Sequence, residues 1–198
     1  MGSSSSSLNK IPNAQELMQE TGFSAAHLLR LYERFEWLDR DNRGNLSPED
    51  FEALGGLAMN PIGGRIICAF FSPGQDTMDF PSFVRILAHF RPTDRHRNKG
   101  GTQQELPNSR NRKLKFAFQL YDMDRDGKIS REELLQVCIH VLRAMLGLQV
   151  TEEQLQSIAE RAIKEADLDK DDAISFEEFK KSLEKVNIEE KMSIGFLQ

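Results

Sequence analysis

The chain has 198 residues, which predicts one or two domains, and its hydrophobic content of 39% is enough for a folded core. The net charge of −5 argues against a general nucleic-acid-binding protein, whose surface would carry an excess of positive charge. The sequence has no run of the roughly 18 apolar residues that span a membrane and no visible secretory signal, so we expect neither a transmembrane helix nor secretion.

The first residues, Met1-Gly-Ser-Ser-Ser-Ser6, match the pattern for N-myristoylation, with Gly2 as the acceptor. A disordered tail or a tag remnant is the alternative for such a serine run. A single myristoyl chain gives only marginal membrane binding, so a second contact would be needed to hold the protein at a membrane. We expect residues 1–23 to form an N-terminal arm with a short helix at 13–20.

The next predicted helix begins after Ser24, a favoured N-cap residue, and its apolar residues recur at three- and four-residue spacing. These are Leu28, Leu31, Phe35 and Leu38. Residues 39–50 then follow the spacing of an EF-hand calcium loop, in which oxygen ligands come from positions 1, 3, 5, 7, 9 and 12, and glycine makes the turn at position 6.

In this first loop, positions 1, 3, 6 and 8 are filled by Asp39, Asp41, Gly44 and Leu46. Arg43 stands at position 5, where a ligand oxygen is needed, and its charge repels a cation. Asp50 at position 12 is one methylene too short to close the site easily with both oxygens. We expect the loop to keep the fold and to bind calcium weakly or not at all, with Pro48 beginning the exiting helix.

A second, fainter hand follows, with helices predicted at 61–70 and 83–90. Placing Met78 at position 8 puts Phe71, Pro73, Gln75, Asp76 and Ser82 at positions 1, 3, 5, 6 and 12. That set cannot hold an ion, so we predict a metal-free loop. Residues 24–90 would form an N-terminal lobe of two degenerate hands.

Residues 91–112 lack apolar periodicity and carry six Lys or Arg, so we expect a basic linker. This linker would be either a solvated connector or a contact for anionic lipid or an acidic partner.

The third loop, residues 122–133, fills every ligand position. Asp122, Asp124 and Asp126 supply carboxylates at positions 1, 3 and 5, Lys128 its carbonyl at 7, Ser130 stands at 9 and Glu133 closes the site with both oxygens. Gly127 makes the turn, and Ile129 should pair with the partner loop through a short β-bridge.

The entering helix of this third hand is expected to start at Asn108 or Ser109, with Leu114, Ala117, Phe118 and Tyr121 facing inward. The exit helix, 132–146, has apolar residues on more than one face, as in a helix that is fully buried or open to a partner.

The fourth hand opens with a capping box, Thr151-x-x-Gln154, and we expect Leu155, Ile158, Ala162 and Ile163 on its inner face. In loop 167–178, Asp167, Asp169, Asp171 and Glu178 fill positions 1, 3, 5 and 12, and Ala173 offers its carbonyl. Asp172 replaces the usual glycine at position 6. Aspartate tolerates a left-handed backbone, so we predict calcium binding here at reduced affinity.

Residues 113–185 would thus form a calcium-binding C-terminal lobe holding two Ca²⁺ ions, and residues 186–198 a hydrophobic C-terminal tail that either covers or joins a groove, or docks on the domain. The predicted fold is all-α, with four EF-hands in two paired lobes and short β-bridges between loops.

Cys68 and Cys138 are isolated and are expected to be buried thiols in a reducing compartment.

Several stretches resemble the calcineurin B homologous proteins over nearly the whole chain. They are Glu20-Thr-Gly-Phe-Ser24, Asn60-Pro-Ile-Gly, Leu87-Ala-His-Phe-Arg-Pro92, Pro107-Asn-Ser-Arg110, Phe116-Ala-Phe-Gln-Leu-Tyr-Asp122 and Lys191-Met-Ser-Ile. Calcineurin B itself shares the four-hand plan, but in that family all four loops are understood to bind calcium. The first and second loops, which lack complete ligand sets, therefore favour the homologous proteins. One departure is the exit helix around Cys138–Val141, which is longer by about one turn than in relatives.

The resemblance implies a myristoylated regulatory subunit of plasma-membrane sodium/proton exchangers. Calcium would occupy the third and fourth hands, and a hydrophobic groove would take an amphipathic juxtamembrane helix of the exchanger. The expected location is the cytoplasm and the inner face of the plasma membrane, with the nucleus as a further compartment. Seven Met and 13 Phe are available to line such a groove.

Two other functions remain open. One is a regulator or inhibitor of a protein phosphatase, with the calcineurin catalytic subunit as partner, and the other is a plain calcium buffer. We do not expect an enzyme, because the four His form no metal or nucleophile motif and no glycine-rich phosphate loop occurs.

Overall fold

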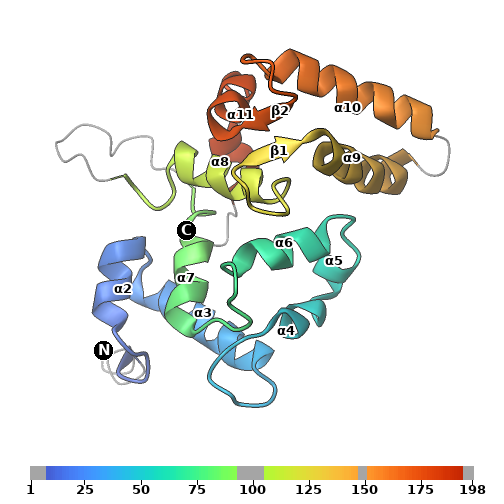
Figure 1. Cartoon of the computed structure of the whole chain (residues 1–198). Coiled ribbons are helices and arrows are strands. Elements are labelled where there is room, and N and C mark those ends of the chain that lie inside the picture. Colours follow the sequence, from blue (N-terminus) through green and yellow to red (C-terminus); the bar gives the residue numbers. More distant parts are fainter. Residues whose placement is uncertain (1–7, 93–104, 147–150, 194–198) are drawn as a thin grey trace. The chain divides into compact units, whose positions relative to one another are not determined.

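The computed structural model describes residues 8–92, 105–146 and 151–193 (Figure 1). These residues are mostly helical, with one two-stranded antiparallel sheet and one isolated β-bridge between loops. This confirms the predicted fold class. None of the described helices is both long enough and apolar enough to cross a bilayer.

The chain forms two compact units. Unit 1 comprises Met1–Leu54, Phe70–Lys113 and Asn187–Gln198, and unit 2 comprises Gly55–Ala69 and Leu114–Val186. Most of the entering helix of the second hand thus groups with the C-terminal hands. The boundaries that the sequence suggested for arm, lobes, linker and tail stay a prediction.

Unit 1 contains α2 (Ala14–Thr21), α3 (Ala25–Leu38), α4 (Pro48–Glu52), α7 (Phe80–Ala88), the start of α8 (Arg110–Gln119) and α12 (Ile188–Lys191). Ser24 caps α3 as predicted, accepting a hydrogen bond from His27 N. The four periodic apolar residues of α3 are all buried. Phe35 packs edge-on against Phe80 with ring centroids 5.4 Å apart, so the first hand's entering helix contacts the second hand's exit helix.

Several helix ends in the first half differ from the prediction by one to three residues. α7 begins at Phe80 rather than Phe83, because Asp79 caps it and accepts a hydrogen bond from Ser82 N at 2.9 Å. α6 (Gly63–Phe70) begins two residues later than predicted, and a short α5 (Gly55–Ala58) precedes it. A Cβ on Gly63 would lie 1.9 Å from Leu57 O, so only glycine fits at this start.

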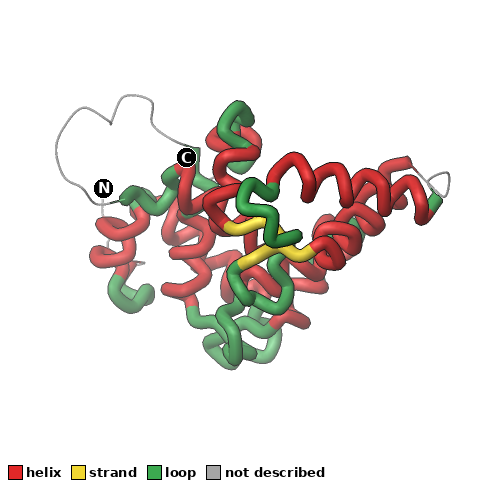
Figure 2. Tube along the Cα trace, turned by 45° about the horizontal axis from the view of Figure 1, so that its top comes forward, coloured by secondary structure: helices red, strands yellow, loops and turns green. Residues whose placement is uncertain are grey.

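Unit 2 is built on the sheet that joins the third and fourth loops. β1 (Lys128–Ser130) pairs with β2 (Ala173–Ser175), and Ile129 lies opposite Ile174, as expected for loop position 8. The two strands lie side by side, as the yellow segments of Figure 2 show. The remaining elements of unit 2 are α9 (Arg131–Leu146), α10 (Glu152–Ala166) and α11 (Phe176–Ser182), together with α5, most of α6 and the part of α8 from Leu114 onward.

The core of unit 2 surrounds the two paired isoleucines. Phe118 packs edge-on against both Phe176 and Phe179, at centroid distances of 5.5 and 5.4 Å. The predicted capping box of α10 is present at Thr151 and Gln154.

The predicted burial of three residues is wrong. Ile158 of α10 is 46% exposed, and Ala159 is buried in its place, because the inward residues of α10 recur at four-residue spacing. Cys68 is exposed and Cys138 half-buried, so neither thiol is a fully buried core residue.

Candidate metal centre

The third loop gathers its three aspartates into one cluster. Carboxylate oxygens of Asp122, Asp124 and Asp126 lie within 4.8 Å of one another. The loop turns at Gly127, whose φ of 90° is left-handed, and Gly127 N donates to Asp122 Oδ2 at 3.2 Å. The cluster is therefore shaped by backbone N–H groups that fix each carboxylate.

Glu133 joins the two ends of this loop. Its Oε1 accepts hydrogen bonds from Met123 N at 2.7 Å and Asp124 N at 3.3 Å, and its Oε2 accepts from Ser130 N and Ser130 Oγ at 2.8 Å. Burial alone would raise the pKa of Glu133, but the hydrogen bonds from Ser130, Met123 and Asp124 outweigh it and lower the pKa. Both oxygens are thus held as a carboxylate at the loop.

Asp122 provides the test of whether a cation fits. The residue is buried, and its Oδ1 has no hydrogen-bond partner among the described residues. Burial raises the pKa of Asp122, and the charges of Glu133 and Asp126 raise it further, although the hydrogen bond from Gly127 lowers it. A buried, unpaired carboxylate oxygen is costly unless a positive charge meets it. The all-oxygen donor set suits a hard cation such as Ca²⁺.

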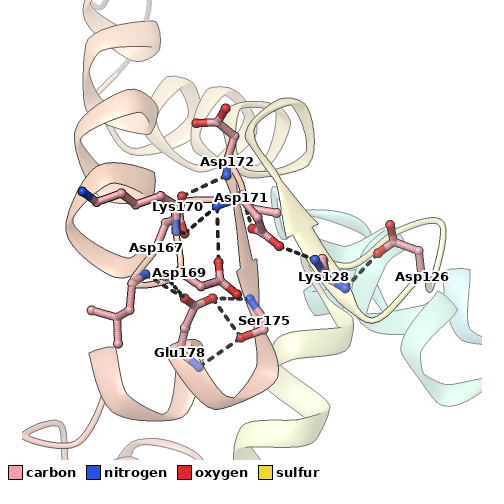
Figure 3. A network of polar contacts seen from close by, with 11 residues as sticks. Asp126, Lys128, Asp167, Asp169, Lys170, Asp171, Asp172, Ser175 and Glu178 are labelled. Atoms are coloured by element: carbon pink, nitrogen blue, oxygen red, sulfur yellow. Dashed lines mark hydrogen bonds and ion pairs between the residues drawn. The ribbon is translucent and has the colours of Figure 1, made fainter.

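The fourth loop repeats this arrangement, as Figure 3 shows. Carboxylate oxygens of Asp167, Asp169 and Asp171 also lie within 4.8 Å of one another. Glu178 Oε1 accepts from Leu168 N at 2.7 Å and from Asp169 N at 3.3 Å. The hydrogen bond from Ser175 N is the largest cause that lowers the pKa of Glu178, to about 2, so its carboxylate is charged throughout the physiological range.

Asp172 makes the turn that glycine makes in the third loop. Its φ is 65°, and its N–H donates to Asp167 Oδ2 at 2.9 Å, as Gly127 N does to Asp122 (Figure 3). The predicted left-handed backbone at position 6 is therefore present. The lower calcium affinity that we expect from it remains a prediction.

The sequence reasoning missed a side-chain contact between the two loops. Lys128, whose carbonyl is a predicted ligand, directs its ammonium group to Asp171 Oδ2 of the fourth loop (Figure 3). The hydrogen bond from Lys128 lowers the pKa of Asp171. The spacing within one loop predicts the backbone pairing at position 8, but not which side chains meet across it. Lys128 and Ala173, the two predicted carbonyl ligands, lie in β1 and β2.

The first and second loops differ from these two cages. In the first, Arg43 pairs with Asp50, with 2.6 Å between Arg43 Nη2 and Asp50 Oδ2. In the second, Asp76 is the one carboxylate among the five residues predicted at its ligand and turn positions. The two loops still pair, because Leu46 and Met78 form a β-bridge with both N–H···O distances at 2.8 Å. Gly2 and residues 194–198 of the predicted tail lie outside the described residues.

Comparisons with known proteins agree with this geometry. Residues 111–184 match the family model of an EF-hand domain pair. The chain is 38% identical over 194 residues to the calcineurin B subunit of Naegleria gruberi, covering 98% of this chain and 99% of that protein. It is 39% identical over 197 residues to the type 1 calcineurin B subunit of Dictyostelium discoideum, covering 99% of each, and 35% identical over 182 residues to the calcineurin B subunit of Candida glabrata, covering 92% and 94%.

These relatives support the broad, calcineurin B-like family of the sequence resemblance, but not its narrower assignment to the calcineurin B homologous proteins. Full-length identity of this size, together with the paired acidic cages, assigns the family. The chain belongs to the calcineurin B family of calcium-binding EF-hand regulatory subunits.

Proposed function

We propose that the chain holds two Ca²⁺ ions, in its third and fourth hands, and uses the loaded C-terminal hands to bind an amphipathic helix of a target protein. The observation that carries the proposal is the unpaired, buried Asp122 Oδ1 within a cluster of carboxylates. Ten residues would hold the ions: Asp122, Asp124, Asp126, Lys128, Glu133, Asp167, Asp169, Asp171, Ala173 and Glu178. Calcium would neutralise these cages and fix the helices that flank them.

The first target is the catalytic subunit of a calcineurin-type phosphatase. The relatives are named as B subunits of calcineurin and match this chain over almost its full length, which supports a partner of the same kind. On unit 2, Ile158 of α10 is exposed and offers an apolar contact to such a helix. The described side chains of α9 end at Val141, so two expectations stay predictions: that this helix is either fully buried or open to a partner, and that the chain has the groove implied by the resemblance.

The second target is the juxtamembrane helix of a plasma-membrane sodium/proton exchanger. The first two hands favour it. The first hand carries an arginine at a ligand position, and the second lacks a ligand set. All four loops of calcineurin B are understood to bind calcium, so these two loops depart from calcineurin B in the direction of the homologous proteins. In this function a myristoyl group on Gly2 would act with the partner contact to hold the protein at the membrane. The protein would then reside in the cytoplasm and at the plasma membrane, with the nucleus as a further compartment.

One binding experiment separates these targets. The full chain, loaded with Ca²⁺, is titrated calorimetrically with a phosphatase catalytic-subunit helix and with an exchanger juxtamembrane helix, each beside a scrambled peptide of equal composition. We expect the phosphatase helix to bind tighter, and both interactions to weaken when Glu133→Gln and Glu178→Gln are combined. Tighter binding of the exchanger helix would transfer the assignment to the second target. Binding of neither helix would contradict a helix-binding regulator and leave a calcium buffer.

A further inference from the structure

The first hand contains a positive charge of its own at the place where the loop would meet an ion. The guanidinium of Arg43 lies between the first and last acids of the loop. Its Nη2 is 2.6 Å from Asp50 Oδ2, and its Nε is 4.0 Å from Asp39 Oδ1. Both acids are well shielded, with 6% and 11% of their side chains exposed, so solvent screens the contacts only partly.

The backbone of this loop is folded like that of the third hand. Gly44 has a left-handed φ of 75°, and its N–H donates to Asp39 Oδ2 at 2.6 Å, as Gly127 N does to Asp122. Ser47 and Asp50 form a capping box at the start of α4. The Leu46–Met78 bridge is closed. The loop thus has the closed form without a complete set of ion ligands.

The length of Asp50 explains why a bridging group is needed. Glu133 reaches both ends of its loop, because one oxygen accepts from the capping Ser130 and the other from Met123 and Asp124. Asp50 is one methylene shorter, and its Oδ2 accepts from Ser47 N at 2.7 Å and from Arg43 Nη2. The arginine therefore extends the connection from position 12 towards Asp39 at position 1.

The charges point the same way. The third and fourth cages each offer four carboxylates at ligand positions. The first loop offers three, from Asp39, Asp41 and Asp50, and Arg43 cancels one of their charges. Fewer negative ligands and a fixed cation at position 5 both oppose a divalent ion.

We propose that Arg43 is the built-in cation of the first hand, which joins the two ends of the loop in place of Ca²⁺, keeps it closed at all calcium concentrations and sets the number of ions that the chain binds. The inference concerns unit 1, and it holds whichever target the loaded C-terminal hands bind. The conformation of the first hand would then be independent of calcium, and only the hands of unit 2 would respond to it.

The main test restores the missing ligands in the full chain. Combining Arg43→Asp with Asp50→Glu supplies an oxygen at position 5 and a longer carboxylate at position 12. Native mass spectrometry in Ca²⁺ should then count one ion more than in the unmodified chain. The matched control combines Arg40→Asp with Asp50→Glu, which makes the same charge change at a position that supplies no side-chain ligand, and its ion count should not change. An unchanged count in a folded double variant, checked by circular dichroism, would overturn the proposal.

A second measurement does not depend on gaining a site. Hydrogen exchange of the Gly44 and Leu46 amides is followed in the full chain with EGTA and with Ca²⁺. We expect equal protection in both conditions, and at least about tenfold faster exchange in Arg43→Gln, because the loop then loses its bridge. Protection in the unmodified chain that appears only with Ca²⁺, or unaltered exchange in Arg43→Gln, would contradict the built-in cation. Neither readout involves a target helix, so failure here is distinct from failure of the proposed function.

Discussion

Single carboxylates in the cages differ in what they cost the protein before calcium arrives. Asp122 is buried with one oxygen unpaired, whereas Asp126 of the same cluster is exposed. An exposed acid is solvated and costs little, but a buried unpaired one destabilises the ion-free fold. The unpaired oxygen of Asp122 therefore carries a desolvation cost that a bound cation would offset.

This difference gives a prediction for Asp122→Asn. The substitution removes a charge from the ligand set, so calcium affinity should fall by at least about tenfold, ~1.4 kcal/mol. It also removes the buried charge, so the melting temperature in EGTA should rise. Asp126→Asn, the control, should weaken calcium binding without that rise. Calorimetric calcium titration and thermal unfolding supply both readings, and a lower melting temperature in EGTA for Asp122→Asn would refute the argument.

Position 6 gives a second prediction at the residue scale. Asp172 holds a left-handed φ of 65°, which costs a residue with a Cβ about 1 kcal/mol more than glycine. Asp172→Gly should therefore tighten calcium binding at the fourth hand about fivefold, and the reciprocal Gly127→Asp should weaken the third hand. Calcium titration of both variants checks this. Affinity that stays the same or falls in Asp172→Gly would show that the turn is not the limiting feature.

Among the elements, α8 is tied to the C-terminal segment by a buried lysine. Lys113 is fully buried, and its ammonium group donates to Arg91 O at 2.9 Å, Met192 O at 2.8 Å and Ser193 Oγ at 3.1 Å. Arg110 adds an ion pair to Glu189 of α12, at 2.9 Å. These contacts join residues 189–193 to the start of the third hand's entering helix.

Lys113→Met should destabilise the fold by about 1–3 kcal/mol, because three acceptors lose their buried donor. Burial lowers the pKa of Lys113 from 10.5 to about 8, against the smaller raising effect of Glu189. The unfolded chain therefore binds more protons than the folded chain between about pH 8 and 10.5, so stability should rise with pH in that window. Urea unfolding at pH 7.5 and 10 measures this.

Lys115→Met is the control, because Lys115 lies exposed on the same helix. It should leave both the stability and its pH dependence close to those of the unmodified chain. In Lys113→Met, the free energy of unfolding should increase less between pH 7.5 and pH 10 than in the unmodified chain. An equal rise in both variants would mean that Lys113 is not the titrating group.

Sequence information was sufficient where the determinants are local. The four loops and their pairing at Leu46 with Met78 and at Ile129 with Ile174 follow from spacing within twelve contiguous residues. Asp79, with Ser82 three residues on, was a readable capping signal for the start of α7 that the apolar pattern obscured. Local patterns therefore position the helices to within a few residues.

The contacts that spacing could not predict join distant segments. A lysine such as Lys113 is usually solvated, and its acceptors come from residues 91, 192 and 193. The sequence marked Arg43 as an obstacle to calcium, but not as a bridge to Asp50. Ile158 was misplaced because a shift of one residue along α10 changes which side chain faces inward.

At the scale of the whole molecule, we expect the response to calcium to be divided unevenly along the chain. The third and fourth loops each place four carboxylates at predicted ligand positions, Arg43 pairs with Asp50 in the first loop, and the second loop lacks the predicted ligand set. A chain of net charge −5 would thus gain four positive charges on loading, all within residues 122–178. Changes in stability and target binding should follow those two cages alone.

Counting bound calcium tests this claim most directly. Native mass spectrometry of the full chain under saturating Ca²⁺ should count two bound ions. At a calcium concentration just sufficient to load the unmodified chain, the variants Glu133→Gln and Glu178→Gln should each bind one ion. Two ions that are lost one at a time in this way would support the account. Three or four ions, or none in the unmodified chain, would contradict it.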